Sequence, residues 1–279
     1  MTKRATGTRE WAEATSNCLI GCNGPTGGGA CRYCYAREIA DRFGQCAWAD
    51  WERPRLRNRD ERTLPRSRSC FGSEELRPVI MFPSTHDICA GFEEACFAHL
   101  QRMLSRGNRI VLVTKGNAQA ALLWPARLVD YRDRIKVRIT ITSDDDALSA
   151  WWEPGAPEFA ERANQLTMWQ MAGFRTSVSI EPCLDFAHLA DLLDIGEFDE
   201  VETIWLGTMN QIARRVRGDD DETRRRVQAV REAQAPETLR ATLQAQLNRV
   251  GSEVAGKVRL KDSLLKVLGL PARTAAEAW

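Results

Sequence analysis

VIMFP at residues 79–83 opens the stretch that decides the fold, which continues through FEEACFAHLQRMLSRG (92–107) and RIVLVT (109–114). The first and last segments are short runs of apolar residues, which is the pattern of strands buried within a sheet. The middle segment is amphipathic and ends at Gly107, as helices commonly do. A strand, a helix and a second strand in this order predict a βαβ unit with parallel strands.

The same alternation extends toward the C-terminus. Further strands are predicted at 136–142, 176–182 and 202–207, and further helices at 117–134, 157–173 and 186–196. A short strand is also expected before residue 17. These six strands predict an α/β fold, a partial (β/α)6-type TIM barrel with parallel strands. A doubly wound open sheet is the competing architecture, and in both folds the carboxyl ends of the strands carry the chemistry.

Two regions lie outside this alternation. Residues 48–77 are rich in arginine, contain prolines and hold few apolar residues, so we expect an Arg-rich insertion there rather than a core element. Residues 219–250 are charged and helical in pattern, and 258–270 begin like a strand and continue like a helix. We therefore expect a barrel core at 1–218 and a C-terminal helical extension at 219–279 that packs on the barrel.

Composition and charge limit the classes of protein to which this chain can belong. The net charge of the 279 residues is +1, and no run of about eighteen apolar residues predicts a transmembrane helix. The N-terminal residues lack the apolar centre of a secretory signal. We expect a cytoplasmic protein with no membrane partner, in which the nine cysteines are reduced thiols or metal ligands.

A second informative stretch is NCLIGCNGPTGGGACRYCYAR at residues 17–37, the cysteine loop, which contains four of the nine cysteines. Cys31 and Cys34 form a Cys-x-x-Cys pair, and Cys22 lies nine positions before Cys31, across a segment with four glycines. A segment so rich in glycine has no core face to present. It can, however, fold back and bring three thiolates onto one centre. A helical pattern follows over residues 35–51.

Three interpretations of these thiols stay open. The cysteines can be small buried residues, as we expect for the isolated cysteines elsewhere. They can form a structural zinc site, if Cys18 and Cys22 join Cys31 and Cys34 as four ligands. They can also hold a [4Fe–4S] cluster through three cysteines, with one iron left open to chelate a cofactor.

The third interpretation is supported by a resemblance to a known family. Cys22 followed by CRYCYAR at 31–37 resembles the cluster loop of the radical S-adenosylmethionine (SAM) superfamily, whose usual motif is Cys-x3-Cys-x-aromatic-Cys. Here eight residues separate the first two cysteines. With this spacing the pattern is similar to a phage- and prophage-associated branch related to spore photoproduct lyase. The resemblance implies a [4Fe–4S] cluster on Cys22, Cys31 and Cys34, with SAM as a second cofactor, and Cys18 lies where relatives often have proline.

The resemblance also assigns roles to residues at the predicted strand ends. It implies that seven residues bind SAM: Tyr33, Thr85, Asp87, Lys115, Thr142, Ser143 and Arg162. Tyr33 matches the aromatic residue near the adenine, and Thr85 or Asp87 stands where the superfamily meets the methionyl amino group. Each residue also has a simpler explanation; Asp87, for example, can cap the following helix.

Three residues are candidates for catalysis. Glu181 lies in an Ile-Glu-Pro segment that matches the lyase-related branch, and Cys183 stands as the counterpart of the hydrogen-donating cysteine of the lyase. His86 is the only one of the three histidines that lies at a predicted strand end. The resemblance spans about residues 11–210, with a shorter match at Lys-Asp-Ser, 261–263.

The resemblance implies an enzyme that cleaves SAM reductively and abstracts a hydrogen atom from its substrate, with flavodoxin or ferredoxin as electron donor. It also implies the cytoplasm of a bacterial host or a phage-infected cell. The segment 48–68 combines tryptophans with arginines: Trp48, Trp51, Arg53, Arg55, Arg57, Arg59, Arg62, Arg66 and Arg68. Since this combination is typical of nucleic-acid binding, we expect a nucleic-acid base, or a hypermodified thymidine in DNA, as the substrate. The alternatives are a peptide or small metabolite as substrate, and a non-enzymatic zinc-stabilised nucleic-acid-binding module.

Overall fold

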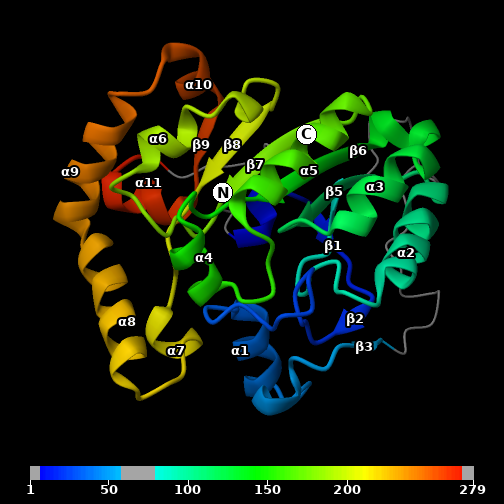
Figure 1. Cartoon of the computed structure of the whole chain (residues 1–279), viewed down its shortest axis with the longest axis horizontal. Helices are drawn as coiled ribbons and strands as arrows, with labels where there is room; N and C mark the ends of the chain where they lie inside the picture. Colours follow the sequence, from blue (N-terminus) through cyan, green and yellow to red (C-terminus); the bar gives the residue numbers. More distant parts are fainter. Residues whose placement is uncertain (1–6, 58–78, 272–279) are drawn as a thin grey trace.

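The fold is built around one parallel sheet. The structure, a computed structural model, describes residues 7–57 and 79–271. The strands of the sheet are, in spatial order, β1 (Ala14–Thr15), β4 (Val79–Phe82), β5 (Arg109–Thr114), β6 (Ile135–Thr140), β7 (Arg175–Ile180), β8 (Thr203–Leu206) and β9 (Val258–Leu260). Every neighbouring pair is parallel. The sheet curves into a half-barrel (Figure 1), which confirms the predicted partial TIM barrel.

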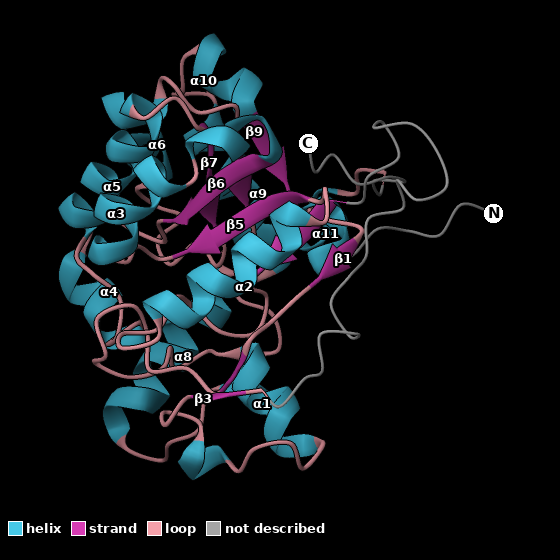
Figure 2. Cartoon of the chain, turned by 90° about the vertical axis from the view of Figure 1, so that its right-hand side faces the viewer, coloured by secondary structure: helices cyan, strands magenta, loops and turns pink. Residues whose placement is uncertain are grey.

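Helices α2 (Glu93–Ser105), α3 (Ala118–Arg127) and α5 (Phe159–Met171) pack side by side over the sheet, and α5 contacts β6 and β7 (Figure 1). The other helices are α1 (Tyr35–Arg42), α4 (Asp146–Trp152), α6 (Leu189–Leu193), α7 (Ile212–Arg215), α8 (Asp221–Ala233), α9 (Pro236–Leu247), α10 (Ser252–Lys257) and α11 (Asp262–Leu268). Figures 1 and 2 show α1 at the end of the molecule opposite α10. Among the described helices, none is long and apolar enough to cross a membrane.

The two faces of the sheet differ in polarity. Successive side chains of a strand point to opposite faces, and all six residues of β6 are buried. Val137 and Ile139 join the hydrophobic core that also contains Leu100 of α2. Arg138 and Thr140 alternate with them and therefore point to the concave face. The concave face thus carries the buried polar residues of β6 together with an apolar cluster that includes Val79, Met81, Val111 and Trp205.

Local boundaries differ from the predictions in the N-terminal part of the chain. The sequence predicts a helix over 35–51, but α1 ends at Arg42, because Gly44 turns the chain with a φ of 64°. A short antiparallel pair, β2 (Leu19–Ile20) with β3 (Arg55–Leu56), is not predicted. It joins the cysteine loop to the start of the Arg-rich insertion, and two-residue strands leave no periodic signal.

The C-terminal region supplies a strand as well as helices. Helices are predicted over 219–250 and in the later part of 258–270, where α8, α9 and α11 are found, and α10 lies between the two predicted segments. The strand-like segment at 258 is β9, which pairs with β8 and makes a seventh strand of the sheet where the sequence predicts six. The division of the chain at residue 218 stays a prediction. Most of the Arg-rich insertion lies outside the described residues, including Arg59, Arg62, Arg66 and Arg68.

Candidate functional site

A cavity of about 310 Å³ lies at the carboxyl ends of strands β4 to β8. Its wall includes residues at or just after the end of each of these strands: Thr85, Asp87, Lys115, Thr140, Glu181 and Thr208. Cys22, Cys31 and Cys34 of the cysteine loop line the same cavity, and so does Tyr33. The fold therefore gathers the three predicted ligands and several of the predicted strand-end residues around one space.

Local backbone contacts hold the thiols. Cys34 caps the N-terminus of α1, where its Sγ accepts a hydrogen bond from the Arg37 N–H at 3.4 Å. The Cys22 Sγ accepts one from the Asp87 N–H at 3.4 Å. Burial raises the pKa of Cys34 to about 11 and the pKa of Cys31 well above its usual value. Both are therefore neutral thiols until a metal displaces the proton.

The donors that face the cavity fit a cluster better than a single ion. Within residues 7–57 and 79–271, no three Cys, His, Asp or Glu side chains converge closely enough to hold one metal ion. Cys18, which the zinc interpretation requires as a fourth ligand, lies in the hydrophobic core with its Sγ 3.6 Å from that of Cys96. Three thiols around an open space match the donor set of a [4Fe–4S] cluster with one open iron.

The glycines of the cysteine loop are needed for close packing. A Cβ on Gly24 would lie 2.2 Å from the Gly155 carbonyl oxygen, and a Cβ on Gly155 would lie 2.0 Å from the Gly29 carbonyl oxygen. The Thr26 N–H donates a hydrogen bond to the Gly155 oxygen at 3.1 Å. The long spacing between the first two cysteines thus builds a segment that docks, backbone to backbone, on the turn after α4. The sequence suggests that the glycines make this segment flexible, whereas in the structure they allow close packing.

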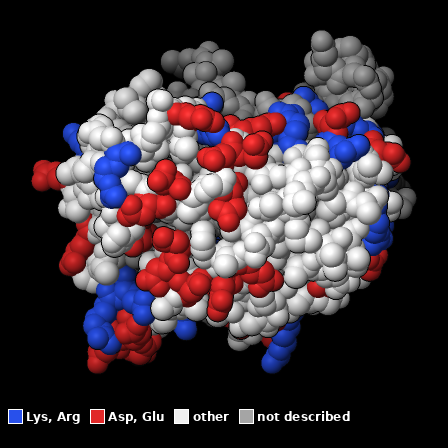
Figure 3. Space-filling view, turned by 45° about the horizontal axis from the view of Figure 1, so that its top comes forward, with Lys and Arg blue, Asp and Glu red and all other residues white. Residues whose placement is uncertain are grey.

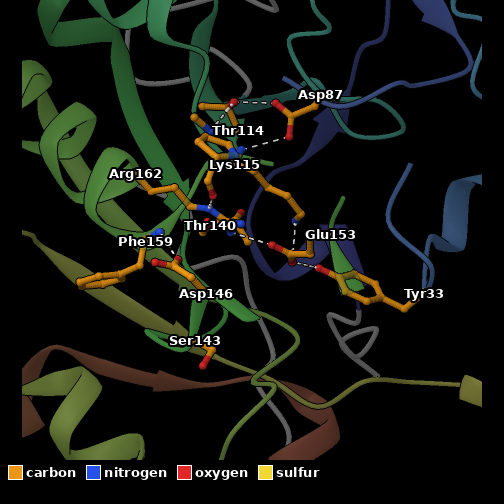
Figure 4. Close-up of polar contacts among 12 residues, drawn as sticks. Tyr33, Asp87, Thr114, Lys115, Thr140, Ser143, Asp146, Glu153, Phe159 and Arg162 are labelled. Atoms are coloured by element: carbon orange, nitrogen blue, oxygen red, sulfur yellow. Dashed lines mark hydrogen bonds and ion pairs between the residues drawn. The ribbon is translucent and has the colours of Figure 1, made fainter. Parts of the chain in front are cut away.

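Glu153, in that turn, is the centre of a buried charge network (Figure 4). Its carboxylate pairs with Arg162 at 2.7 Å and with the Lys115 Nζ at 3.6 Å, and the Tyr33 hydroxyl donates to it. Burial by itself raises the pKa of Glu153, but the charges of Lys115 and Arg162 outweigh burial and hold the pKa at about 2. The ionised carboxylate therefore orients Tyr33, which lies inside the Cys-x-x-Cys pair.

Asp87 joins the ends of β4 and β5. Its carboxylate accepts hydrogen bonds from the Thr114 hydroxyl at 2.5 Å and from the Lys115 N–H at 3.0 Å (Figure 4). It also accepts one from the Ile88 N–H at 2.8 Å. The sequence offers a helix cap as the simpler role of Asp87, but α2 begins later, at Glu93. Asp87 instead fixes the loops that form one side of the cavity.

His86 lines the cavity, but both of its ring nitrogens contact the backbone. The Nε2 atom accepts hydrogen bonds from the Cys18 N–H at 3.2 Å and the Leu19 N–H at 3.3 Å. The Nδ1 atom lies 2.6 Å from the Asp87 carbonyl oxygen, so it carries the proton. This arrangement assigns His86 a structural role and does not support the acid–base role that the sequence suggests.

Four predicted site residues lie behind the cavity wall: Thr142, Ser143, Arg162 and Cys183. The Ser143 hydroxyl accepts a hydrogen bond from the Asp145 N–H at 3.0 Å, at the start of α4. Arg162 donates to the Thr140 carbonyl at 3.1 Å and belongs to the network of Glu153. Cys183 is 1% exposed and lies in the hydrophobic core. A hydrogen donor must reach the substrate, and the geometry gives no support to Cys183 in that role.

Charged residues from the chain termini also reach the cavity, and sequence reasoning did not place them there. Lys261, before α11, forms a buried ion pair with Glu10 at 2.8 Å and a second ion pair with the partly exposed Glu181 at 3.4 Å. Arg215 of α7 is a further lining residue. In the sequence, this part of the cavity is indicated only by the short family resemblance at residues 261–263, because Glu10 and Lys261 are too far apart in the chain to form a local pattern.

Arginines stack on two tryptophans near the cysteine loop. The distances from guanidinium carbon to ring centre are 4.3 Å for Arg37 and 3.9 Å for Arg217 over Trp48, and 4.4 Å for Arg32 and 4.9 Å for Arg226 over Trp151. These are cation–π distances. The stacks connect the cysteine loop and its neighbours to the region of α7 and α8.

Acidic residues occupy a different part of the surface. The segment that follows α6 exposes Asp194, Glu197, Asp199 and Glu200. Acidic side chains gather on the face that Figure 3 shows. Such a face repels phosphates, so it limits where a polyanion can approach the protein.

Comparison with known proteins finds likeness at the level of the fold. No protein-family model and no curated protein matches the sequence. A structure of spore photoproduct lyase complexed with dinucleoside spore photoproduct is similar with a TM-score of 0.51 and 15% identity, over 93% of this chain and 79% of that chain. A double mutant of the lyase with bound AdoMet and the same dinucleoside gives 0.51 and 14%, and a single mutant gives 0.50 and 17%, at the same coverage. At these identities the two proteins share a fold.

We expect Gly155→Ala to destabilise the cysteine loop, because its Cβ would overlap the Gly29 carbonyl oxygen. The free energy of unfolding should fall by about 1–3 kcal/mol in urea denaturation. The amide of Thr26 should exchange faster with deuterium, since its acceptor moves. Gly196→Ala is the matched control, since nothing lies within 4 Å of the added Cβ. Equal stability of the two variants would contradict the docking.

We expect Glu153→Gln to lower the free energy of unfolding at neutral pH by about 3 kcal/mol, because it leaves Arg162 buried without its partner. The folded-state pKa of about 2 lies below the usual 4.5. The contribution of the carboxylate is therefore complete above 4.5 and is lost as the pH falls toward 2. Urea denaturation between pH 7 and pH 4 should show that the difference in free energy of unfolding between wild type and variant begins to narrow near pH 4.

The exposed Glu158→Gln serves as control for this measurement, and its effect should stay within about 0.5 kcal/mol. If the difference in free energy of unfolding between wild type and Glu153→Gln grows as the pH falls, the result would contradict the buried ion pairs.

Proposed function

We propose that this protein is a radical SAM enzyme. Cys22, Cys31 and Cys34 would hold a [4Fe–4S] cluster, and SAM would occupy the adjoining part of the cavity. The observation that carries the proposal is that these three thiols, and not Cys18, line one cavity together with the strand-end residues of a half-barrel. The shared fold with spore photoproduct lyase, one structure of which contains AdoMet, supports it.

The cluster and SAM, when bound, supply one-electron reductive cleavage of SAM and hydrogen-atom abstraction from the substrate. The residues of the chain bind and orient these groups. Tyr33, held by Glu153, offers a fixed aromatic face beside the thiols. Thr85, Asp87 and Lys115 line the wall next to them. A flavodoxin or ferredoxin is the class of electron donor that we propose.

The predicted SAM contacts divide into two groups. Tyr33, Thr85, Asp87 and Lys115 line the cavity and are proposed to touch the cofactor. Thr142, Ser143 and Arg162 are proposed as positioning residues: Arg162 acts through Glu153, and Ser143 through the start of α4. Glu181 lines the cavity and pairs with Lys261, so it is the remaining candidate for a direct role on the substrate.

For the substrate we propose a nucleic-acid base. The stacked arginines and tryptophans lie near the cysteine loop, and aromatic and cationic groups bind bases and phosphates. The lyase structures contain a dinucleoside photoproduct. The resemblance of the cysteine loop to a phage-associated branch favours a hypermodified thymidine in DNA. A base in a duplex would have to be flipped out to reach the cavity.

Anaerobic reconstitution with iron and sulfide tests the proposal. We expect a brown protein with about four irons per chain, and 5′-deoxyadenosine from SAM after addition of a reductant. Cys31→Ala should lose the visible absorption and the SAM cleavage. Cys46→Ala is the matched control, because Cys46 is buried beside α1 and does not line the cavity. It should keep both properties.

A colourless protein with one tightly bound zinc would support the zinc-stabilised module and overturn the proposal. The wild-type protein could hold the cluster and cleave SAM, yet bind oligonucleotides no more tightly than the Arg32→Ala variant. That result would leave the cofactor chemistry intact and favour a peptide or small metabolite as the substrate.

A further inference from the structure

Two pairs of cysteines link the cysteine loop to the α2 region. The Cys18 and Cys96 sulfurs lie 3.6 Å apart, and the Cys89 and Cys22 sulfurs lie 3.7 Å apart. These are contact distances between unbonded sulfurs. A change of side-chain rotamers brings such a pair to the S–S bond length of about 2.05 Å when the backbone separation allows it. Both pairs are therefore candidate disulfide sites.

The pairs differ in their access to the cavity. Cys22 lines the cavity and is partly exposed, whereas Cys89 is 0% exposed directly behind it. Cys18 and Cys96 are both buried in the hydrophobic core. A small oxidant that enters the cavity reaches Cys22 first. Cys89, whose sulfur lies 3.7 Å from that of Cys22, is then a second thiol in contact with it.

The backbone around the Cys22–Cys89 pair is already fixed at short range. The Ala90 N–H donates to the Gly24 carbonyl at 3.2 Å, and the Asp87 N–H donates to the Cys22 Sγ at 3.4 Å. These bonds tie residues 87–90 to residues 22–24 on both sides of the sulfurs. The folded backbone therefore holds the two sulfurs near each other.

We propose that Cys89 is a resolving cysteine for Cys22 in the iron-free protein, an inference that rests on the proposed role of Cys22 as a cluster ligand. Peroxide oxidises the Cys22 thiol to a sulfenic acid and is reduced to water. The Cys89 thiol then attacks the Cys22 sulfur, an S–S bond forms, and the sulfenic oxygen leaves as a second water. Overall, two thiols and one hydrogen peroxide give one disulfide and two waters.

This chemistry protects the site. Without a neighbouring thiol, a sulfenic acid proceeds to sulfinic and sulfonic acids, which thiol reductants do not reverse. A Cys22–Cys89 disulfide withholds one ligand from iron while the oxidant is present. A dithiol reductant reopens it and restores the three-thiol site.

Treatment of the iron-free, fully reduced protein with hydrogen peroxide, followed by alkylation, digestion and mass spectrometry, tests the proposal. The wild type should yield a cross-linked peptide pair containing Cys22 and Cys89. In Cys89→Ser, Cys22 should appear as sulfinic or sulfonic acid. After dithiothreitol, iron uptake should recover in the wild type and should be lower by about tenfold in Cys89→Ser, since over-oxidised thiols no longer bind.

Cys96→Ser is the matched control and should behave as the wild type does, because neither Cys18 nor Cys96 lines the cavity. Sulfinic acid at Cys22 of the wild type, or a Cys18–Cys96 cross-link in place of the expected one, overturns the proposal. If Cys89→Ser folds poorly, Cys89→Ala and the wild-type peptide map decide the question.

The outcome is separate from that of the proposed function. The cross-link is measured without iron, and iron uptake by untreated, reduced protein tests cluster binding alone. Iron uptake without the cross-link overturns only the resolving role of Cys89. A cross-link in a protein that never takes up iron supports the thiol chemistry and overturns the proposed function.

Discussion

The buried carboxylate of Glu153 is the interaction on which the site depends. An ionised carboxylate without exposure to solvent is tolerated only where cations and hydrogen-bond donors surround it. Here Arg162 from α5, Lys115 from the end of β5 and Tyr33 from the cysteine loop supply them. One charge therefore holds together a helix, a strand end and the segment between two of the proposed ligands. Loss of this charge would disturb the position of the loop before it disturbed the sheet.

The docking of the cysteine loop follows from the same turn. Glu153 brings its neighbours in the chain, including Gly155, against the glycine-rich segment, where the two backbones approach too closely for any Cβ. The charge network and the glycine contacts thus act on one junction. Beneath it, the alternation of β6 directs apolar residues outward to the helices and polar residues inward. The half-barrel therefore has an apolar outer layer, and its interior combines these polar residues with the apolar cluster around Trp205. The cavity at the strand ends leaves room for a cofactor.

Much of this arrangement was predictable from the sequence. The strands and helices followed from hydrophobic periodicity, and the parallel half-barrel followed from their alternation. The convergence of Asp87 and Glu181 followed from the rule that strand ends share one edge, and the three thiols of the cysteine loop followed from its resemblance to a known family. The strand-end rule also suggested His86, and the resemblance to the lyase suggested Cys183, but neither could give the direction of the side chain. A position at a strand end does not tell which way a side chain points, and His86 and Cys183 turn toward backbone and core.

Local pattern determined the order of secondary structure, and the resemblance of the cysteine loop to a known family singled out Cys22, Cys31 and Cys34 as the predicted ligands. Both depend on residues that are close in the chain. The folded chain alone decided that Glu153 binds Tyr33, that Lys261 meets Glu10, and that Cys89 lies against Cys22. These contacts join segments far apart in sequence. They exist only because the curved sheet brings its strand ends, the cysteine loop and the C-terminal strand around one cavity, and no spacing of residues along the chain encodes that curvature.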